Sequence, residues 1–473
     1  WVVTSYLVAN GIMIPMTGWI SGRFGRKRYF LTSVMAFVAA SAACGAAQSL
    51  GQMVLFRLAQ GVAGAAMVPS SQAILMETFP PDEQQMAMAT WGVGLMVAPI
   101  IGPTLGGWIT DNWNWRWNFY INVPIGIIAF LMVSAFVHDP AFLRQRRARG
   151  GRVDYLGIAC LVVGLGLLQI VLDRGQRADW FAAIWVVAAT ACSALALITL
   201  VINELRFAAP ILDLRILKDR VFSLAVFLIV VMSGTLWGTG FLTPVFLQEL
   251  MGYTAWKAGL MMVPRALSAM IAMFAVGQIA RLRIDTRPMI GLGFLLTSIG
   301  LWWMAGWSLD VSLHVIVVDS IVLGAGLGMI FPVLSAVGFA GVRRERVGDA
   351  ASLYNLMRNT GAAMGISYLT NTLVNYEQVH QSRLVEHVSV FDAWRLSQRG
   401  PRMPGSPPFH LMGQLITGQK QGLGMVYGMI MSQAAILSFD DLYRILSMLM
   451  ILMVPAFLGL RRAQAHSAPI HLE

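Results

Sequence analysis

The stretch GWISGRFGRKRYF, residues 18–30, decides how the rest of the chain is interpreted. It closes an apolar segment with two glycines four residues apart and then places four cationic side chains among the six residues 23–28. Positive charge packed against the end of an apolar segment is typical of the cytoplasmic end of a membrane helix. The stretch therefore indicates a chain that crosses a bilayer.

Composition supports a membrane protein. Hydrophobic residues make up 57% of the 473 residues and charged residues only 12%, and the mean hydropathy is +0.66. A net charge of +11 would suggest nucleic acid as a partner of a soluble protein, but here the Lys and Arg residues lie in short loops. Cys44, Cys160 and Cys192 lie in apolar stretches without metal-ligand spacing, so we interpret them as packing residues.

Stretches of about 20 apolar residues follow one another along the chain, which is the length that a helix needs to cross a bilayer. We predict thirteen spans, at 1–21, 29–47, 52–76, 86–108, 118–137, 155–173, 181–203, 221–248, 255–280, 288–307, 312–340, 350–373 and 441–460. The chain begins with Trp1 inside an apolar run, so we expect a further span before it. No signal peptide is visible in the printed sequence.

The distribution of charge among the short loops predicts the orientation. The loops on the side of RFGRKR hold 21 Lys and Arg residues, whereas the short loops opposite hold four. By the positive-inside rule the basic side is cytoplasmic. The segment 374–440 then lies outside. The alternative is that 422–439 forms another membrane segment, which would place the C-terminus on the opposite side of the membrane.

Two distant segments of the chain are similar to each other. QGVAGAAMVP at 60–69 matches LGAGLGMIFP at 323–332, with Gly61 to Pro69 and Gly324 to Pro332 at equal spacing. Upstream of each segment a glycine, Gly18 or Gly277, precedes a basic loop. This order predicts two related halves in parallel orientation, as in transporters that hold their substrate between two repeats.

The opening stretch resembles the signature loop of the major facilitator superfamily, G-x-x-x-D-R-x-G-R-[RK]. The matching residues are Gly18, Gly22, Arg23, Gly25, Arg26 and Lys27, and Gly22 stands where the family has Asp. Small residues let helices approach closely, and the cations would anchor the helix end at the anionic cytoplasmic leaflet.

Further segments resemble the EmrB/QacA-type drug:proton antiporters, a fourteen-span branch of this superfamily. Arg57, Gln60, Gly61 and Gly64 match the fourth-span motif of the superfamily. The fifth-span antiporter motif is matched at Gly102, Pro103, Gly106 and Gly107, with Ala98 in place of its first glycine. WRWNFYINVPIG, LQELMGYTAWKAGL and SQAAILSFDDLYRIL are similar to EmrB-type exporters, the nearest group in the branch.

The resemblance implies an all-α integral membrane protein of the major facilitator fold. Two pseudo-symmetric six-helix bundles would flank two extra central helices, and the first span would be missing from this chain. The expected divisions are an N-terminal bundle at 1–137 with spans two to six, a basic cytoplasmic linker at 138–154, two extra spans at 155–203, a second linker at 204–220, and a C-terminal bundle at 221–473 with the outer loop 374–440.

Charged residues inside spans are costly and are functional candidates by default. Arg57 is expected to coordinate a proton-carrying carboxylate or backbone carbonyls. For Asp319 two interpretations stay open: a proton carrier whose neutral form burial favours, or a carboxylate near the outer interface. Arg358 has a functional interpretation and a structural one, in which its side chain reaches the cytoplasmic surface. Arg265 would pair with Asp319 or face a wet cavity.

Two other groups of residues complete the candidate site. Pro99 and Pro103 remove backbone hydrogen bonds while Gly102, Gly106 and Gly107 allow close packing, so the fifth span should bend or pack unusually closely. Tight packing without a part in transport is the alternative. Trp237, Phe241, Gln248, Tyr354 and Asn355 are assigned to the substrate cavity because the resemblance places their spans there.

No phosphate-binding GxxxxGK[ST] motif or HExxH motif is present, so we expect no enzyme, metal or cofactor, and an ion gradient as the energy source. The resemblance implies proton-driven export of lipophilic drugs or toxic compounds across a bacterial inner membrane. The alternatives are proton-linked uptake of a small nutrient and a membrane receptor or scaffold without transport. A periplasmic adaptor protein and an outer-membrane channel are the partners that the resemblance implies, with 374–440 as the docking surface.

Overall fold

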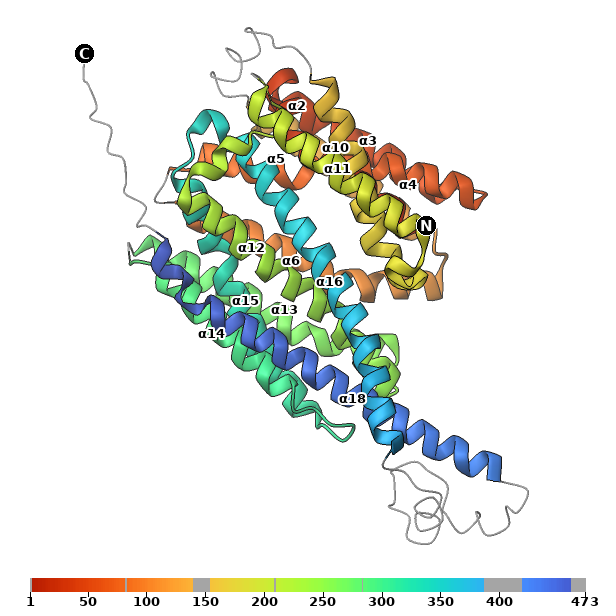
Figure 1. Ribbon diagram of the computed structural model, residues 1–473. Helices are drawn as coiled ribbons and strands as arrows, with labels where there is room; N and C mark the ends of the chain where they lie inside the picture. The colour runs from red at the N-terminus through yellow and green to blue at the C-terminus, as the bar shows by residue number, and fades with distance from the viewer. Residues whose placement is uncertain are drawn as a thin grey trace, which may run out of the picture.

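The computed structural model describes residues 2–80, 83–138, 154–207, 210–282, 284–386 and 419–460. Every regular element in these ranges is a helix, and Figure 1 shows them as long rods gathered into bundles. Nine of the helical segments in this part of the chain are long and apolar enough to cross a membrane. Each of the thirteen predicted spans falls largely within helix, so the all-α prediction is confirmed.

The first and third spans of the N-terminal bundle are each broken near their middle. α1 and α2 are separated by a turn at Pro15, and α4 and α5 by a turn at Ala65 and Ala66. The helices of this bundle are α1 (Val2–Met13), α2 (Thr17–Phe24), α3 (Arg26–Ala46), α4 (Leu50–Gly64), α5 (Met67–Thr78), α6 (Gln84–Asn112), α7 (Trp117–Tyr120) and α8 (Asn122–Phe136). α4 packs against both α1 and α3, and α8 packs against α3.

The next helices form a hairpin that packs against both halves. α10 (Tyr155–Arg174) and α11 (Ile184–Arg206) are joined through two short 3₁₀ turns, η1 (Gln176–Ala178) and η2 (Trp180–Ala182). α10 contacts α1 on one side and α16 on the other. The two extra spans therefore lie beside the boundary between the bundles.

The C-terminal bundle holds the longest helices. Its elements are α12 (Arg220–Val245) with the π-helical segment η4 (Phe246–Leu250), α13 (Ala255–Arg281), α14 (Arg287–Met304), α15 (Leu313–Ala340), α16 (Val347–Glu386) and α18 (Gln419–Met453) with η7 (Val454–Gly459). The short turns η3 (Leu214–Lys218) and η5 (Arg344–Arg346) lie in the connections before α12 and α16. α15 packs against α13 and α14, and α16 against α12 and α18.

Polar side chains begin several of these helices at the positions where the first backbone N–H groups lack partners. A side-chain oxygen accepts from a backbone N–H in the first turn at Ser49, Asp154, Asp219, Thr254 and Ser312. Such N-caps each stabilise a helix by about 1 kcal/mol. They explain why α4, α10, α12, α13 and α15 start where they do.

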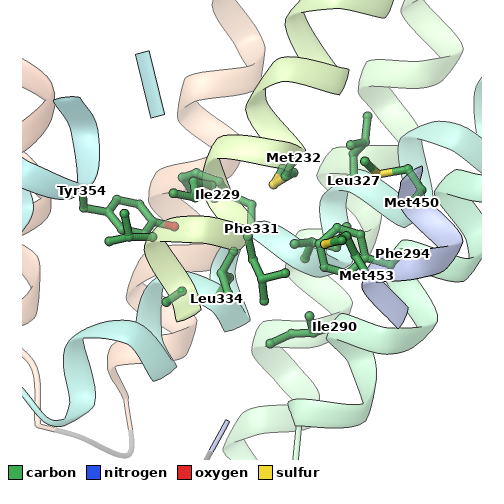
Figure 2. Close-up of a cluster of buried hydrophobic side chains, with 14 of the residues drawn as sticks. Ile229, Met232, Ile290, Phe294, Leu327, Phe331, Leu334, Tyr354, Met450 and Met453 are labelled. Carbon is green, nitrogen blue, oxygen red and sulfur yellow. The ribbon is translucent and has the colours of Figure 1, made fainter. Parts of the chain in front are cut away.

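Figure 2 shows the apolar core of the C-terminal bundle, built from α12, α14, α15, α16 and α18. Phe294 of α14 and Tyr354 of α16 are fully buried there, with Phe331 of α15 close to fully buried. Lipid is as apolar as these side chains, so close van der Waals packing and not transfer from water holds such helices together.

The prediction of an outer loop at 374–440 is wrong at both of its ends. α16 continues to Glu386, and α18 begins at Gln419, well before the predicted span 441–460. The alternative of a separate membrane segment at 422–439 is also wrong, because these residues form one helix with 440–453. Polar residues in these helices lower the local hydropathy, so the full length of the two helices was not predicted. His380 and Asp441 are two such residues, and their side chains contact each other across the α16–α18 interface.

Candidate functional site

The two repeated glycine positions lie at equivalent contacts between the bundles. We call the end of the molecule where α2 meets α3 and α15 meets α16 the basic end. There a Cβ added to Gly18 of α2 would lie 2.8 Å from Asp349 Cα of α16. A Cβ added to Gly277 of α13 would lie 2.6 Å from Met86 Sδ of α6. Glycine at both positions lets one bundle close upon the other at the basic end.

The second repeated glycine acts within each bundle. A Cβ added to Gly61 of α4 would lie 2.5 Å from the carbonyl oxygen of Tyr6 in α1. One added to Gly324 of α15 would overlap the carbonyl oxygen of Arg265 in α13. The sequence repeat therefore corresponds to two matching helix pairs, α1 with α4 and α13 with α15.

The signature loop has a structural role that differs from the one expected. Gly25 has φ +94°, a conformation that favours glycine, and it turns the chain from α2 into α3. The Arg26 guanidinium is buried, forms an ion pair with Glu77 of α5 and lies beside Gly348 of α16. Lys27 Nζ donates to the carbonyl oxygen of Ser134 at 2.7 Å.

The prediction that these cations anchor the loop at the lipid surface is therefore wrong for Arg26, which pairs inside the protein because Glu77 is within reach. Arg23 lies over the Trp19 ring, 5.7 Å from its centroid. Gly22 is buried in α2.

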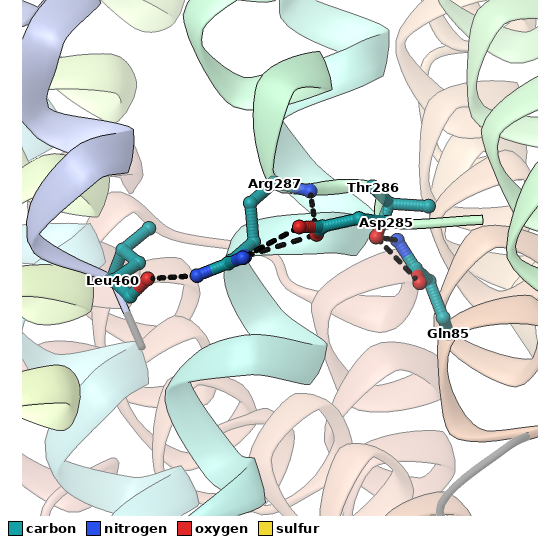
Figure 3. Close-up of polar contacts among 5 residues, drawn as sticks. All are labelled: Gln85, Asp285, Thr286, Arg287 and Leu460. Atoms are coloured by element: carbon teal, nitrogen blue, oxygen red, sulfur yellow. Dashed lines mark hydrogen bonds and ion pairs between the residues drawn. The ribbon is translucent and has the colours of Figure 1, made fainter. Parts of the chain in front are cut away.

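A second polar network closes the basic end between α6 and the C-terminal bundle (Figure 3). The Gln85 side chain of α6 donates to Thr286 Oγ1 at 2.8 Å. Next to it, Arg287 pairs with Asp285 and donates from Nη1 to the carbonyl oxygen of Leu460 at 2.8 Å. These bonds join α6, the start of α14 and the end of η7.

Deeper in the molecule, buried polar and aromatic contacts cross the bundle boundary. Asn355 of α16 donates from Nδ2 to Gln72 Oε1 of α5 at 2.7 Å. Trp91 of α6 stacks on Phe331 of α15 at a centroid distance of 5.7 Å, and its Nε1 donates to Ser71 Oγ. We call these contacts the inner floor. The sequence assigned Asn355 to the substrate cavity, and its completely buried side chain instead joins the two halves.

Arg358 lies one helical turn beyond the inner floor. It follows Asn355 by three residues, so both side chains lie on one face of α16. Its Nη1 is buried and has no hydrogen-bond partner in the protein. A buried guanidinium nitrogen without a partner inside a membrane span is costly, so Arg358 stays a functional candidate, and Nε of Arg57 is in the same situation.

The other two predicted arginines have partners inside the protein, although Nε of Arg57 is buried without one. The Arg57 guanidinium lies 4.6 Å from the Phe119 ring centroid, and its Nη1 donates to Gln60 Oε1 at 3.0 Å. The expected carboxylate or carbonyl partner is thus replaced by an aromatic ring and an amide. Buried Arg265 donates to Thr239 Oγ1 and to the carbonyl oxygen of Leu236.

Asp319 does not pair with Arg265. It is buried in the second turn of α15, near the end opposite the basic end, and accepts a hydrogen bond from Trp307 Nε1 at 2.7 Å. Trp307 in turn lies 5.5 Å from Phe246 between ring centroids. This placement favours the interpretation of Asp319 as a carboxylate near the outer interface.

Replacing Trp307 by Phe is expected to lower the free energy of unfolding by about 1–3 kcal/mol, because it leaves a buried carboxylate without its donor. Phe keeps most of the ring contact. Thermal unfolding of the purified protein in detergent measures the effect. Trp302→Phe is the matched control, since Trp302 is 54% exposed in α14, five residues before Trp307. Equal midpoints for the two variants would contradict a stabilising role for the Trp307–Asp319 bond.

The antiporter motif on α6 does not pack as expected. A Cβ added at Gly102 would meet no atom within 4 Å, and one at Gly106 would be at an ordinary 3.5 Å from Asn118. Close approach of α6 to α13 occurs instead at Gly92, whose added Cβ would be 2.9 Å from Met273 Sδ. Pro103 and Gly107 lie in α6, but their surroundings are outside the described residues.

The predicted cavity residues do not come together. Trp237, Phe241 and Gln248 are exposed on one side of α12 and η4. Tyr354 and Asn355 are completely buried, and the Tyr354 hydroxyl lies 3.2 Å from Ser335 Oγ within the core. The three predicted residues of α12 and η4 lie at the surface of the bundle, and the two of α16 lie in its interior. The order of the spans in the sequence does not indicate how deeply a residue lies.

Two further residues were not singled out. His380 lies beyond the predicted end of the span 350–373, and Asp441 is the first residue of the predicted span 441–460. His380 Nε2 of α16 lies 3.0 Å from Asp441 Oδ2 of α18. Asp441 in turn lies 3.8 Å from Arg444 Nη1. The motif FDDLYR contained the signal, since a carboxylate pair within an apolar helix is unusual. Among the described residues, no group of three or more His, Cys, Asp or Glu side chains is placed to hold a metal ion.

Comparison with known proteins identifies relatives along almost the whole chain. The family described as Major Facilitator Superfamily matches residues 1–366. Multidrug export protein EmrB of Escherichia coli (strain K12) is 33% identical over 456 residues, covering 94% of this chain and 84% of that protein. Fatty acid resistance protein FarB of Neisseria gonorrhoeae is 32% identical, covering 96% and 87%. The structure of the human organic anion transporter MFSD10 matches with a TM-score of 0.57 at 16% identity, covering 95% and 82%.

Proposed function

The chain belongs to the major facilitator superfamily, and on this premise we propose that it exports lipophilic drugs or toxic compounds by alternating access, in exchange for protons. The relatives described above include one protein named for multidrug export and one named for fatty acid resistance. We place it in a bacterial inner membrane, with the basic end facing the cytoplasm.

The observation that supports alternating access is the pair of glycine contacts at the basic end. Gly18 against Asp349 and Gly277 against Met86 join opposite bundles at equivalent positions of the repeat. At each contact one of the two helices contributes no side chain, so no interlocked pair of side chains has to separate when the two halves rock apart there as units. Such motion would open the inner floor to the cytoplasm.

We propose that the proton gradient is the only energy source and that no cofactor is bound. Membership of the superfamily supports this assignment, because proton coupling is typical of that family. A contact between His380 and Asp441, 3.0 Å long, also lies at the α16–α18 interface. The pair joins α16 to α18, and α16 also carries Asn355 and Arg358. A movement at this interface would therefore act on the helix that forms one side of the inner floor.

Export through two membranes would need partners. We propose a periplasmic adaptor protein and an outer-membrane channel, as the resemblance to EmrB-type exporters implies. The extension of α16 and α18 beyond α14, visible in Figure 1, is the surface that we assign to the adaptor.

Inverted membrane vesicles test the proposal. When respiration acidifies their interior, the lipophilic dye Hoechst 33342 is expected to leave the membrane for the lumen, and its fluorescence is expected to fall. A protonophore should reverse the signal, and vesicles without the protein are the control. Dye movement in the opposite direction would support uptake, and no movement across a panel of lipophilic compounds would support a receptor or scaffold.

A further inference from the structure

A groove lies between the extra helix pair and the C-terminal bundle, at the end opposite the basic end. It has a volume of ≈ 630 Å³ and lies between the α10–α11 connection on one side and α16 on the other. Met364, Ser367, Tyr368, Asn371, Asn375 and Gln378 form its wall on α16. These positions recur every three or four residues, so they are one continuous stripe of that helix.

Three polar atoms at this groove are buried without a hydrogen-bond partner in the protein. They are Gln176 Oε1, Trp180 Nε1 and Ser367 Oγ, and all three residues line the groove. Ser367 as a residue is 8% exposed. Folded proteins satisfy nearly all buried polar atoms, so three unpartnered atoms in residues that line one groove are unusual. A turn of these side chains toward the groove would let a ligand complete them.

The backbone beside the groove is strained. Asp179 and Trp180 are consecutive non-glycine residues with φ +52° and +50°, in the left-handed region. This conformation costs free energy and is found mainly where function requires it. Here it turns the chain between η1 and η2, and the Trp180 ring covers Gly175, whose added Cβ would lie 2.9 Å from Trp180 Cε3.

The remaining lining defines the chemistry of the ligand. Tyr368 is 56% exposed and Met364 51% exposed, so apolar surface is open beside the unpartnered polar atoms. The uncharged amides of Asn371, Asn375 and Gln378 add donors and acceptors, and Asp179 is the single charged residue among those that line the groove. This surface suits an uncharged aromatic molecule with one or two hydrogen-bonding groups, and it disfavours an anion.

We propose that this groove binds exported compounds after they leave the space between the bundles, as a second, outer binding station for uncharged aromatic cargo. The proposal rests on the proposed function for the identity of the ligand as cargo. Binding itself depends only on the groove. The extra helix pair then has a defined role, since α10, η1 and η2 form one side of this station.

Equilibrium binding of N-phenyl-1-naphthylamine to the full chain in nanodiscs, without a gradient, tests the station. This probe is uncharged and aromatic, carries one N–H group, and becomes fluorescent in apolar sites. The double variant Gln176→Leu with Ser367→Ala removes two of the unpartnered atoms. We expect its Kd to rise about tenfold, as the loss of one or two hydrogen bonds predicts. Its unfolding midpoint should stay unchanged or rise, because no bond within the protein is lost.

The matched control is Ser382→Ala, since that hydroxyl donates to Val379 of its own helix and lies outside the groove. Wild-type affinity in the double variant would overturn the proposal, as would a Kd that rises equally in the control. Displacement of the probe by monooleoylglycerol, combined with no export of the probe by vesicles that do export Hoechst 33342, would assign the groove to lipid and overturn the cargo assignment. If vesicles export nothing while the double variant binds the probe more weakly than the wild type does, the proposed function fails and the groove remains a binding site.

Discussion

The variant Gly324→Ala is expected to unfold far below the wild-type temperature. The added Cβ would overlap the Arg265 carbonyl oxygen and lie 2.8 Å from its carbonyl carbon, and both are backbone atoms of α13. Backbone cannot move aside as a flexible side chain would, so α13 and α15 must separate along their contact. We expect a loss of about 3 kcal/mol, the upper range for overpacking a buried site. Thermal unfolding in detergent, followed by size-exclusion chromatography, measures it.

A graded series of alanine variants controls this prediction. Gly61→Ala, at the equivalent position of the other half, would place its Cβ 2.5 Å from the Tyr6 carbonyl oxygen and should destabilise less. Gly259→Ala lies in α13 itself, where a Cβ meets nothing within 4 Å, and should leave the midpoint unchanged or slightly raised. If Gly324→Ala and Gly259→Ala unfold at the same temperature, the close α13–α15 contact does not exist.

Arg358→Gln is expected to abolish export while making the protein more stable. Nη1 of Arg358 is buried without a partner, so removing the charge relieves a desolvation cost of about 1 kcal/mol or more. Arg358 lies one helical turn from the Asn355–Gln72 contact of the inner floor. An anionic or polar group of an exported compound that passes this contact would meet the Arg358 guanidinium. We expect gradient-driven export of Hoechst 33342 to fall at least about tenfold, the effect of losing a charged hydrogen bond.

Two variants separate this expectation from a general defect. Arg206→Gln removes an exposed side chain at the end of α11 and should change neither export nor stability appreciably. Arg358→Lys keeps the charge and should restore part of the export. Full export by Arg358→Gln, or a lowered unfolding midpoint without loss of export, would show that the guanidinium only supports the fold.

Several features of the fold could be predicted because they depend on local patterns. The glycine repeat at 61 and 324 predicted two related halves, and both glycines make equivalent close contacts. The helix at 374–386 and the start of α18 could not be predicted, because their polar residues are compensated by contacts between two segments distant in sequence.

The candidate site was predicted in part. Arg358 was singled out as a charge inside a span and Asn355 as a cavity residue. Asn355 is buried, and its partner is Gln72, which is 283 positions away and carries no recognisable signal. Arg26 and Arg57 were predicted to contact lipid headgroups and a carboxylate, and they contact Glu77 and an aromatic ring instead. A charge in a span indicates that a partner is needed without indicating which one.

The sequence alone determined the membrane class, the order of the spans and the family, because hydropathy and glycine spacing are properties of short segments. Only the tertiary structure decided which helices close the basic end, which charges are satisfied, and where unpartnered polar atoms line a groove. Those outcomes depend on side chains brought within a few ångströms by packing between segments far apart in the chain. No local pattern specifies such distances.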